Sequence, residues 1–360
     1  MDFVYFATGL GLMVVGASFL IQGASRLALS LGLSPLVIGL TVVAYGTSAP
    51  EVAVSVGAVL SGQNDIAIGN VVGSNIFNVL FILGASALIV PLVVNNQIIR
   101  QEVPIMIAVS VLLIVLLHDR RLGIFEGGLL LVLLVGYTWF IIAQARRANR
   151  AAAAQLEKVE LEPSAGGWTN SRLAQVGMMI GGLACLVIGS RLLVTASVAF
   201  AQALGVSDLV IGLTIVAAGT SLPEVATSIT AAIKGERDIA VGNVVGSSIF
   251  NILGCLGLSG VVAGTAGIGI APSVLAFDIW VMLATAVACI PTFLSGREIA
   301  RWEGFVFLAY YACYVAYLIL AAEQHDALAT LNAAMVYFAI PITLATALAI
   351  YLRKSRDGNA

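Results

Sequence analysis

Charged residues are scarce in this chain: only 10% of its 360 residues are Asp, Glu, Lys or Arg, and 60% are apolar. A soluble domain carries about 25% charged residues, so this composition excludes an ordinary soluble enzyme. The formal net charge is −2, which leaves no basic surplus for binding nucleic acid. The chain has only two histidines and four cysteines, and no CxxC pair, so neither a zinc site nor a disulfide framework is expected.

Apolar segments long enough to cross a bilayer recur along the whole chain. We expect eleven spanning helices, at about residues 3–29, 35–60, 66–90, 102–117, 122–143, 173–203, 208–233, 239–263, 272–294, 303–321 and 330–352. The polar stretch 144–172 is predicted to be a cytoplasmic linker between a first half of five helices, 1–143, and a second half of five, 173–321. Residues 322–360 would then supply an eleventh helix and a cytoplasmic C-terminus.

The distribution of arginine and lysine predicts the orientation, because loops on the cytoplasmic side carry an excess of both. If the N-terminus lies outside, 13 of the 17 basic residues fall in inner loops and 2 in outer loops. We therefore expect an integral protein of the plasma or inner membrane, with its N-terminus outside and its C-terminus in the cytoplasm.

An internal repeat is the strongest feature of the sequence. Residues 37–80 and 210–253 align without a gap, with 30 identities in 44 positions. Five spans separate the two copies, and because five is odd, the second copy enters the membrane from the opposite side. Inverted repeats with an ion site at their interface are typical of secondary transporters.

Each copy places one glutamate inside a spanning segment, Glu51 in the first and Glu224 in the second. A charged side chain at the bilayer centre costs about 2.5–3.5 kcal/mol, so a repeated one needs a reason. A structural ion pair with Arg26 or Arg191 is one alternative, but neither arginine occupies a matched position. The favoured interpretation is a cation site that both carboxylates share.

Oxygen-bearing residues precede each glutamate at helical spacing. Thr47 and Ser48 lie four and three residues before Glu51, and Pro50 should break the helix and leave the carbonyl of Gly46 without a donor. The second copy repeats this arrangement with Thr220, Ser221, Glu224, Pro223 and Gly219. A kinked packing helix would explain one such motif, but Ca²⁺ prefers about six to eight oxygen ligands, and the duplication favours a site for a hard cation.

The following helix of each copy adds neutral oxygens at matched positions. These are Ser74 and Asn78 in the first copy and Ser247 and Asn251 in the second, four residues apart in each case. Residues at this spacing share one helix face, so each pair can face the same cavity. For Asn70 and Asn243, an ion-ligand role and an interhelical hydrogen bond remain equal alternatives.

The motifs GTSAPE with GNVVGSNIFN, and GTSLPE with GNVVGSSIFN, resemble the two alpha-repeats of the calcium/cation antiporter superfamily. The sodium/calcium exchanger branch and its prokaryotic relatives are the closer match. The resemblance implies ten core helices in two inverted halves, so the eleventh is an addition here. It implies a Ca²⁺ site formed by Glu51 and Glu224 with the backbone carbonyls of Thr47 and Thr220. It also implies Na⁺ sites built from Ser48, Ser74, Ser221, Ser247 and the carbonyls of Ala44 and Ala217, with Asn78 and Asn251 as the remaining central polar pair.

The sequence therefore predicts an all-α polytopic membrane protein, with two inverted five-helix repeats plus an eleventh helix, that exchanges Na⁺ for Ca²⁺. With an inward Na⁺ gradient the expected direction is Ca²⁺ export. Some relatives, including potassium-dependent ones, carry aspartate where this chain has Asn251, which argues against K⁺ dependence here.

Three other functions are alternatives to this prediction. A proton-driven Ca²⁺ antiporter is the main alternative, because protonation of the same two glutamates would replace Na⁺. A cation channel is disfavoured by the absence of a symmetric selectivity filter, and an intramembrane protease by the absence of an intramembrane histidine. The sequence indicates no cofactor, and no partner beyond the two ions and the lipid bilayer.

Overall fold

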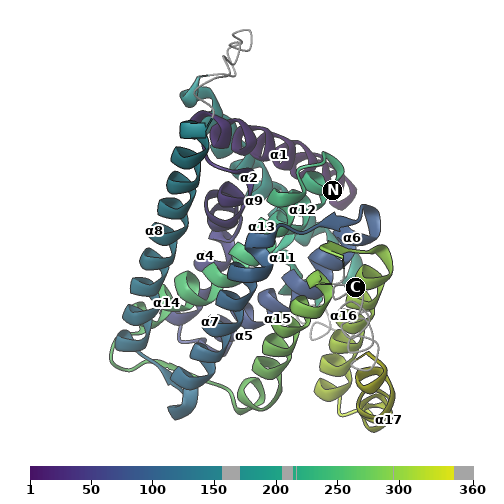
Figure 1. The fold of residues 1–360 in the computed structure, drawn as a ribbon. Coiled ribbons are helices and arrows are strands. Elements are labelled where there is room, and N and C mark those ends of the chain that lie inside the picture. Colours follow the sequence, from purple (N-terminus) through teal and green to yellow (C-terminus); the bar gives the residue numbers. More distant parts are fainter. Residues whose placement is uncertain (156–170, 205–213, 216, 295, 344–360) are drawn as a thin grey trace, which may run out of the picture.

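The computed structural model describes residues 1–155, 171–204, 214–215, 217–294 and 296–343, which are almost entirely helical (Figure 1). Eight uninterrupted helical segments of this described part are long and apolar enough to cross a membrane. In chain order they are α1 (Asp2–Leu31); α5, η2 and α6 (Asn64–Phe77, Asn78–Leu83, Gly84–Ile89); η3, α7 and η4 (Ile98–Glu102, Val103–Leu116, Leu117–Asp119); α8 (Ile124–Gln155); α9 (Arg172–Ala203); α13, η7 and α14 (Arg237–Phe250, Asn251–Leu256, Gly257–Ala263); η8 and α15 (Val274–Asp278, Ile279–Leu294); and α16 (Arg301–Ala322). The predicted all-α polytopic membrane architecture is confirmed.

One further span is broken in its middle. Its first part is α2 (Pro35–Ile38), η1 (Gly39–Val43) and α3 (Ala44–Thr47), and α4 (Ala49–Leu60) continues from it at an angle of 42°. Pro50 lies in the first turn of α4, where its missing N–H costs no helical hydrogen bond. The helix break expected at this proline is therefore confirmed.

The equivalent span of the second half is described in part. Short helix α11 (Ala217–Gly219) and helix α12 (Leu222–Ile233) flank the second GTS motif, and residues 205–213 and 216 lie outside the described residues. In the expected eleventh span, α17 (Ala327–Ala334) and η9 (Met335–Ala339) are described, but 344–360 lie outside. The number of eleven spans stays a prediction.

The region between the two halves differs from a simple polar loop. Helix α8 continues to Gln155, so the expected linker 144–172 begins inside this helix, and α9 starts at Arg172. Residues 156–170 lie outside the described residues. The expected division of the chain at 143, 172 and 321 is otherwise untested and stays a prediction.

Two short antiparallel ribbons join the halves. Strand β1 (Leu92–Val93) pairs with β4 (Glu298–Ile299), and β2 (Arg121–Leu122) pairs with β3 (Ile268–Gly269). Each ribbon takes one strand from each half of the chain. The two halves are therefore interlocked by backbone hydrogen bonds as well as by helix packing.

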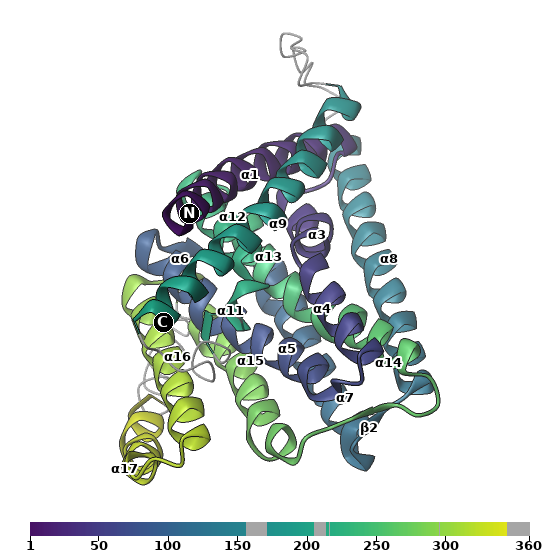
Figure 2. The same ribbon diagram turned by 180° about the vertical axis from the view of Figure 1, so that it is seen from behind.

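Helices α1 and α9 pack against each other over most of their length and lie together on one side of the bundle (Figures 1 and 2). Glycines make this close approach possible: a Cβ on Gly16 would lie 2.7 Å from the carbonyl oxygen of Gly182, and a Cβ on Gly9 2.8 Å from that of Gly189. Because Gly9 faces Gly189 and Gly16 faces Gly182, the helices run antiparallel. The contact is tight enough that α1 and α9 form one packing unit.

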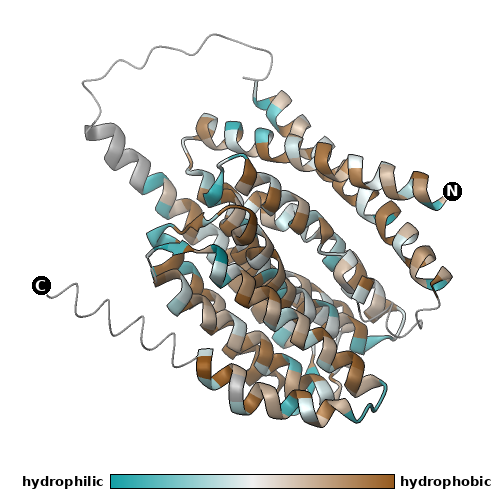
Figure 3. Ribbon diagram, turned by 90° about the vertical axis from the view of Figure 1, so that its right-hand side faces the viewer, coloured by the Kyte–Doolittle hydropathy of each residue, from teal (hydrophilic) through white to brown (hydrophobic). Residues whose placement is uncertain are grey.

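Hydrophobic residues make up most of the length of the helices, and hydrophilic residues gather towards helix ends (Figure 3). Large side chains such as Phe125, Trp139 and Phe305 are 83%, 69% and 64% exposed. Exposed apolar surface on this scale marks contact with a non-aqueous environment. At the centre of the bundle, α13 and η7 are buried on nearly every face.

Candidate functional site

The two predicted glutamates meet at the centre of the molecule. Glu51 lies in the first turn of α4 and Glu224 in the first turn of α12, and both are completely buried, at 0% and 1% exposure. Each therefore sits where a helix begins, at the positive end of the helix dipole, which favours a negative charge. Carboxylates from the two halves of the chain are thus brought into one buried site.

Serine hydroxyls connect the two glutamates in a crossed pattern. Ser48 Oγ donates to Glu224 Oε1 over 2.8 Å, and Ser221 Oγ donates to Glu51 Oε1 over 2.9 Å. Each serine thus binds the glutamate of the other half. Ser48 lies at the helix break, between the end of α3 and the start of α4, and its hydroxyl reaches across the interface.

The backbone at the two breaks has the same conformation. Ser48 has φ −83° and ψ 8°, and Ser221 has φ −88° and ψ 5°. The crossed hydrogen bonds therefore follow from a local structure that both copies of the motif adopt. An inverted repeat with a two-fold relation at its centre accounts for this symmetry.

Threonines and asparagines form a second crossed pair of contacts around the glutamates. Thr47 Oγ1 donates to Asn243 Oδ1 over 3.1 Å, and Asn243 Nδ2 donates to Ser228 Oγ over 3.0 Å. In the other half, Thr220 Oγ1 donates to Asn70 Oδ1 over 3.3 Å, and Asn70 Nδ2 donates to Ser55 Oγ over 3.0 Å. Of the two alternatives for Asn70 and Asn243, the structure shows the interhelical hydrogen bond.

Two further predicted serines and the carbonyl of Ala44 also lie at this interface. Ser74 Oγ is 3.2 Å from Ser221 Oγ, and Ser247 Oγ donates to the carbonyl oxygen of Ala44 over 3.4 Å. Ala217 is the first residue of α11. The structure thus places Ser74 beside the crossed serines and Ser247 against the first GTS segment.

One carbonyl that a proline was expected to leave without a donor accepts a hydrogen bond from another helix. The Gly219 oxygen, which Pro223 leaves without a helical donor, accepts from Ser190 Oγ over 2.7 Å. This bond attaches α9 to the broken helix of the second half. The equivalent position in α1 is Ala17, which has no hydroxyl, so the two halves differ here.

Four buried polar atoms at this interface make no hydrogen bond within the described part of the chain. They are Oε2 of Glu51, Oε2 of Glu224, and both amide atoms of Asn78. Buried polar atoms without a partner are rare in folded proteins and need an explanation such as an ion or water. Two carboxylate oxygens and an amide oxygen are the ligand types that hard cations such as Ca²⁺ and Na⁺ take.

The donor set does not suit a resident transition metal. Among the described residues, no group of three or more His, Cys, Asp or Glu side chains could hold a metal ion. Two carboxylates with neutral hydroxyl and carbonyl oxygens instead match a hard cation.

Asn78 and Asn251 each begin a π-helical segment, η2 and η7, at equivalent positions of the two halves. Single-turn π-helices inside α-helices occur frequently at functional sites. The structure adds two residues that the sequence analysis missed: Asn75 and Cys255 both contact the Asn251 amide. Matched positions of the repeat do not reveal them, because the two copies differ at both of these positions. For Asn75 the signal was the single difference between GNVVGSNIFN and GNVVGSSIFN; Cys255 lies outside this motif, opposite Ile82 of the first copy.

Buried carboxylates at the interface of two inverted membrane halves define a class of protein, the secondary transporters of cations. The chain belongs to a particular family of that class: residues 1–143 and 174–320 match the family described as sodium/calcium exchanger protein. Members of this family are antiporters, so the protein is a transporter of cations and not an enzyme. The matched ranges leave out residues 144–173 and 321–360, which contain the expected linker and the eleventh helix.

Several relatives are similar over nearly their whole length. The putative antiporter CaxA of Alkalimonas amylolytica is 39% identical over 309 residues, which cover 85% of this chain and 94% of CaxA. The sodium/calcium exchanger MaX1 of Methanosarcina acetivorans is 35% identical over 348 residues, covering 88% and 98%. A solved structure of the sodium-calcium exchanger NCX_Mj, soaked with Na⁺ and Sr²⁺, matches with a TM-score of 0.73 and 30% identity, covering 88% of this chain and 97% of that one.

Proposed function

We propose that this protein exchanges Na⁺ for Ca²⁺ across the membrane at one site shared by the two halves. The observation that carries the proposal is the crossed pair of serine–glutamate hydrogen bonds, which leaves one oxygen of each buried carboxylate without a partner in the described structure. Ca²⁺ binds between Glu51 and Glu224, with the backbone carbonyls of Thr47 and Thr220 as further ligands. The names of MaX1 and NCX_Mj support the choice of the two ions.

Na⁺ occupies the positions flanking the Ca²⁺ site. Its ligands are the hydroxyls of Ser48, Ser74, Ser221 and Ser247, the carbonyls of Ala44 and Ala217, and the same two carboxylates. The 3.2 Å separation of the Ser74 and Ser221 oxygens and the 3.4 Å bond from Ser247 to Ala44 support this assignment, because each brings two candidate ligands together.

Exchange follows from competition for the two carboxylates. Two ionised glutamates in one buried site repel each other unless a cation neutralises them. One Ca²⁺ or several Na⁺ ions meet this requirement equally, but not both sets at once. When either Ca²⁺ or Na⁺ ions fill the site, the charge of the two carboxylates is neutralised. An empty site keeps this charge, which is costly to bury in a water-free occluded state.

Helices α1 and α9 supply the moving unit. Helix α9 reaches both helix breaks: Leu183 packs on Gly46, where a Cβ would lie 2.8 Å from the leucine Cδ1, and Val194 packs on Gly219. Ser190 adds its hydrogen bond to the Gly219 carbonyl. A displacement of the α1–α9 unit along the bundle therefore acts on both ends of the site, as alternating access requires.

The distribution of basic residues supports an N-terminus outside and a C-terminus in the cytoplasm, and with an inward Na⁺ gradient the proposed exchange moves Ca²⁺ out of the cell. The driving ion is tested by ⁴⁵Ca²⁺ uptake into proteoliposomes loaded with Na⁺ and diluted into Na⁺-free buffer. A matched set carries only a pH gradient, and vesicles with the Glu51→Gln variant serve as the control. Uptake that needs internal Na⁺ supports the proposal, whereas uptake driven by the pH gradient alone would show a proton-coupled antiporter using the same glutamates.

A further inference from the structure

The central pair Asn78 and Asn251 is symmetric in sequence but not in its contacts. The Asn251 amide is held at both ends: its Nδ2 donates to Asn75 Oδ1 over 3.1 Å, and Cys255 Sγ donates to its Oδ1 over 3.6 Å. Asn78 is 1% exposed, yet neither atom of its amide has a hydrogen bond in the described part of the chain. Within the described part of the chain, hydrogen bonds therefore hold the amide of one asparagine of the pair and not that of the other.

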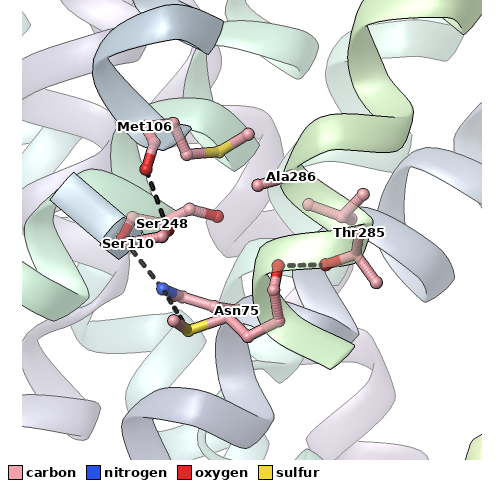
Figure 4. A pocket seen from close by; sticks show the side chains of 8 residues that line it. Asn75, Met106, Ser110, Ser248, Thr285 and Ala286 are labelled. Atoms are coloured by element: carbon pink, nitrogen blue, oxygen red, sulfur yellow. Dashed lines mark hydrogen bonds between the residues drawn. The ribbon is translucent and has the colours of Figure 1, made fainter. Parts of the chain in front are cut away.

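Asn75 is itself fixed by the second half of the protein. It is 3% exposed, and its Nδ2 donates to the carbonyl oxygen of Ser248 over 3.1 Å and lies 3.7 Å from Met282 Sδ (Figure 4). Ser248 lies three residues before the π-helical segment η7, which begins at Asn251. Asn75 thus bridges from the first half to the backbone of α13, at Ser248, and to the side chain of Asn251, the first residue of η7.

The first half lacks both of these restraints. The counterpart of Asn75 is Ser248, whose shorter side chain donates to the Val244 carbonyl of its own helix over 2.9 Å. The counterpart of Cys255 is Ile82, which has no donor. No equivalent side chain therefore reaches Asn78, so the difference between the two amides follows directly from two substitutions between the copies.

We propose that Asn75 and Cys255 are positioning residues that lock the Asn251 amide, leaving Asn78 as the adaptable ligand of the central pair. This inference rests on the proposed function, because it assigns different parts to two residues of that site. The Asn78 amide turns its oxygen to a cation and reorients when ions exchange. Asn251 keeps one orientation throughout, so the symmetric repeat provides one rigid and one adjustable side of the ion site.

The test is a double-mutant cycle on the full-length protein, read as the Kd for Ca²⁺ by calorimetry in Na⁺-free detergent solution. Asn75→Ser introduces the residue of the other copy and removes the acceptor for Asn251. Loss of one hydrogen bond changes an equilibrium by about 2- to 10-fold, and we expect the Kd to rise by this factor. The rise in Kd caused by Asn75→Ser should persist when Asn78→Ala is also present and disappear when Asn251→Ala is present. The reason is that coupled residues give non-additive effects.

Ser110→Ala is the matched control. Ser110 lines the same small cavity beside Asn75, a space of about 10 Å³ that is near the smallest able to hold a water, but donates only to the Met106 carbonyl over 2.8 Å (Figure 4). The Kd of the Ser110→Ala variant for Ca²⁺ should equal that of the unaltered protein. If Asn75→Ser alone does not fold, the double variant Asn75→Ser/Ser248→Asn is used instead, because it keeps the buried volume. In the background of this double variant, Asn78→Ala should weaken Ca²⁺ binding less than Asn251→Ala does.

The possible results separate the positioning role of Asn75 from the proposed function. An Asn75→Ser effect of the same size in the Asn251→Ala background would overturn the positioning role, and so would an unchanged Kd. Absence of Ca²⁺ binding by the unaltered protein would overturn the proposed function and this inference with it. Ca²⁺ binding by the unaltered protein without the coupling would overturn this inference alone.

Discussion

Replacing Gly182 by alanine should push α1 and α9 apart, because the two helices meet backbone to backbone at this point. An alanine Cβ there would lie 2.7 Å from both the Gly16 carbonyl oxygen and the Leu20 nitrogen. Ordinary Cβ contacts begin at 3.4 Å, so the helices would have to separate locally by 0.7 Å, which is the difference between these distances. Overpacking of this kind costs about 1–3 kcal/mol in the free energy of unfolding.

Gly181 provides the control on the same helix. A Cβ at Gly181 meets nothing within 4 Å, so Gly181→Ala adds a methyl group without a clash. Because alanine favours a helix over glycine by about 1 kcal/mol, this variant should be at least as stable as the original protein. Thermal unfolding in detergent should give a lower midpoint for Gly182→Ala only. Equal midpoints for the two variants would contradict the tight α1–α9 unit and the rigid-body movement derived from it.

Four further substitutions test the site and its surroundings. Glu51→Gln and Glu224→Gln should each abolish Ca²⁺ uptake in folded, inserted protein, because the remaining carboxylate cannot neutralise a divalent ion; substantial uptake by either would rule out the shared site. Asn251→Asp should make uptake more dependent on pH, because it adds a titratable carboxyl group to the central pair, and an unchanged pH profile would remove residue 251 from the site. Ser190→Ala leaves the buried Gly219 carbonyl without its donor, so the free energy of unfolding should fall by about 1–3 kcal/mol. An unaltered unfolding midpoint would contradict this contact.

The sequence identified the broad architecture because its signals are local. Apolar runs, a gapless repeat and a proline after a GTS motif predict helices, two related halves and a helix break, and each follows from chain chemistry without knowledge of packing. Glu51 and Glu224 stood out for the same reason, since a carboxylate in a membrane helix is costly wherever the helix packs.

Contacts across the interface could not be read in this way. The direction of the Ser48 hydroxyl depends on the break at that residue and on the position of the other half, so it reaches Glu224 and not the nearer glutamate in sequence. The role of Asn75 depends on which side chain faces it across the interface. Comparing repeat copies finds what both halves share, but the restraints on Asn251 arise where the copies differ.

The most direct test is whether Na⁺ and Ca²⁺ compete for the same carboxylates. Binding of ⁴⁵Ca²⁺ to the purified protein should be measured at rising Na⁺ concentration, with choline replacing Na⁺ to keep ionic strength constant. A shared site requires that Na⁺ raise the apparent Kd for Ca²⁺ while the amount bound at saturation stays the same. Binding of Ca²⁺ with an unchanged Kd at every Na⁺ concentration would contradict a site at which the two ions replace each other.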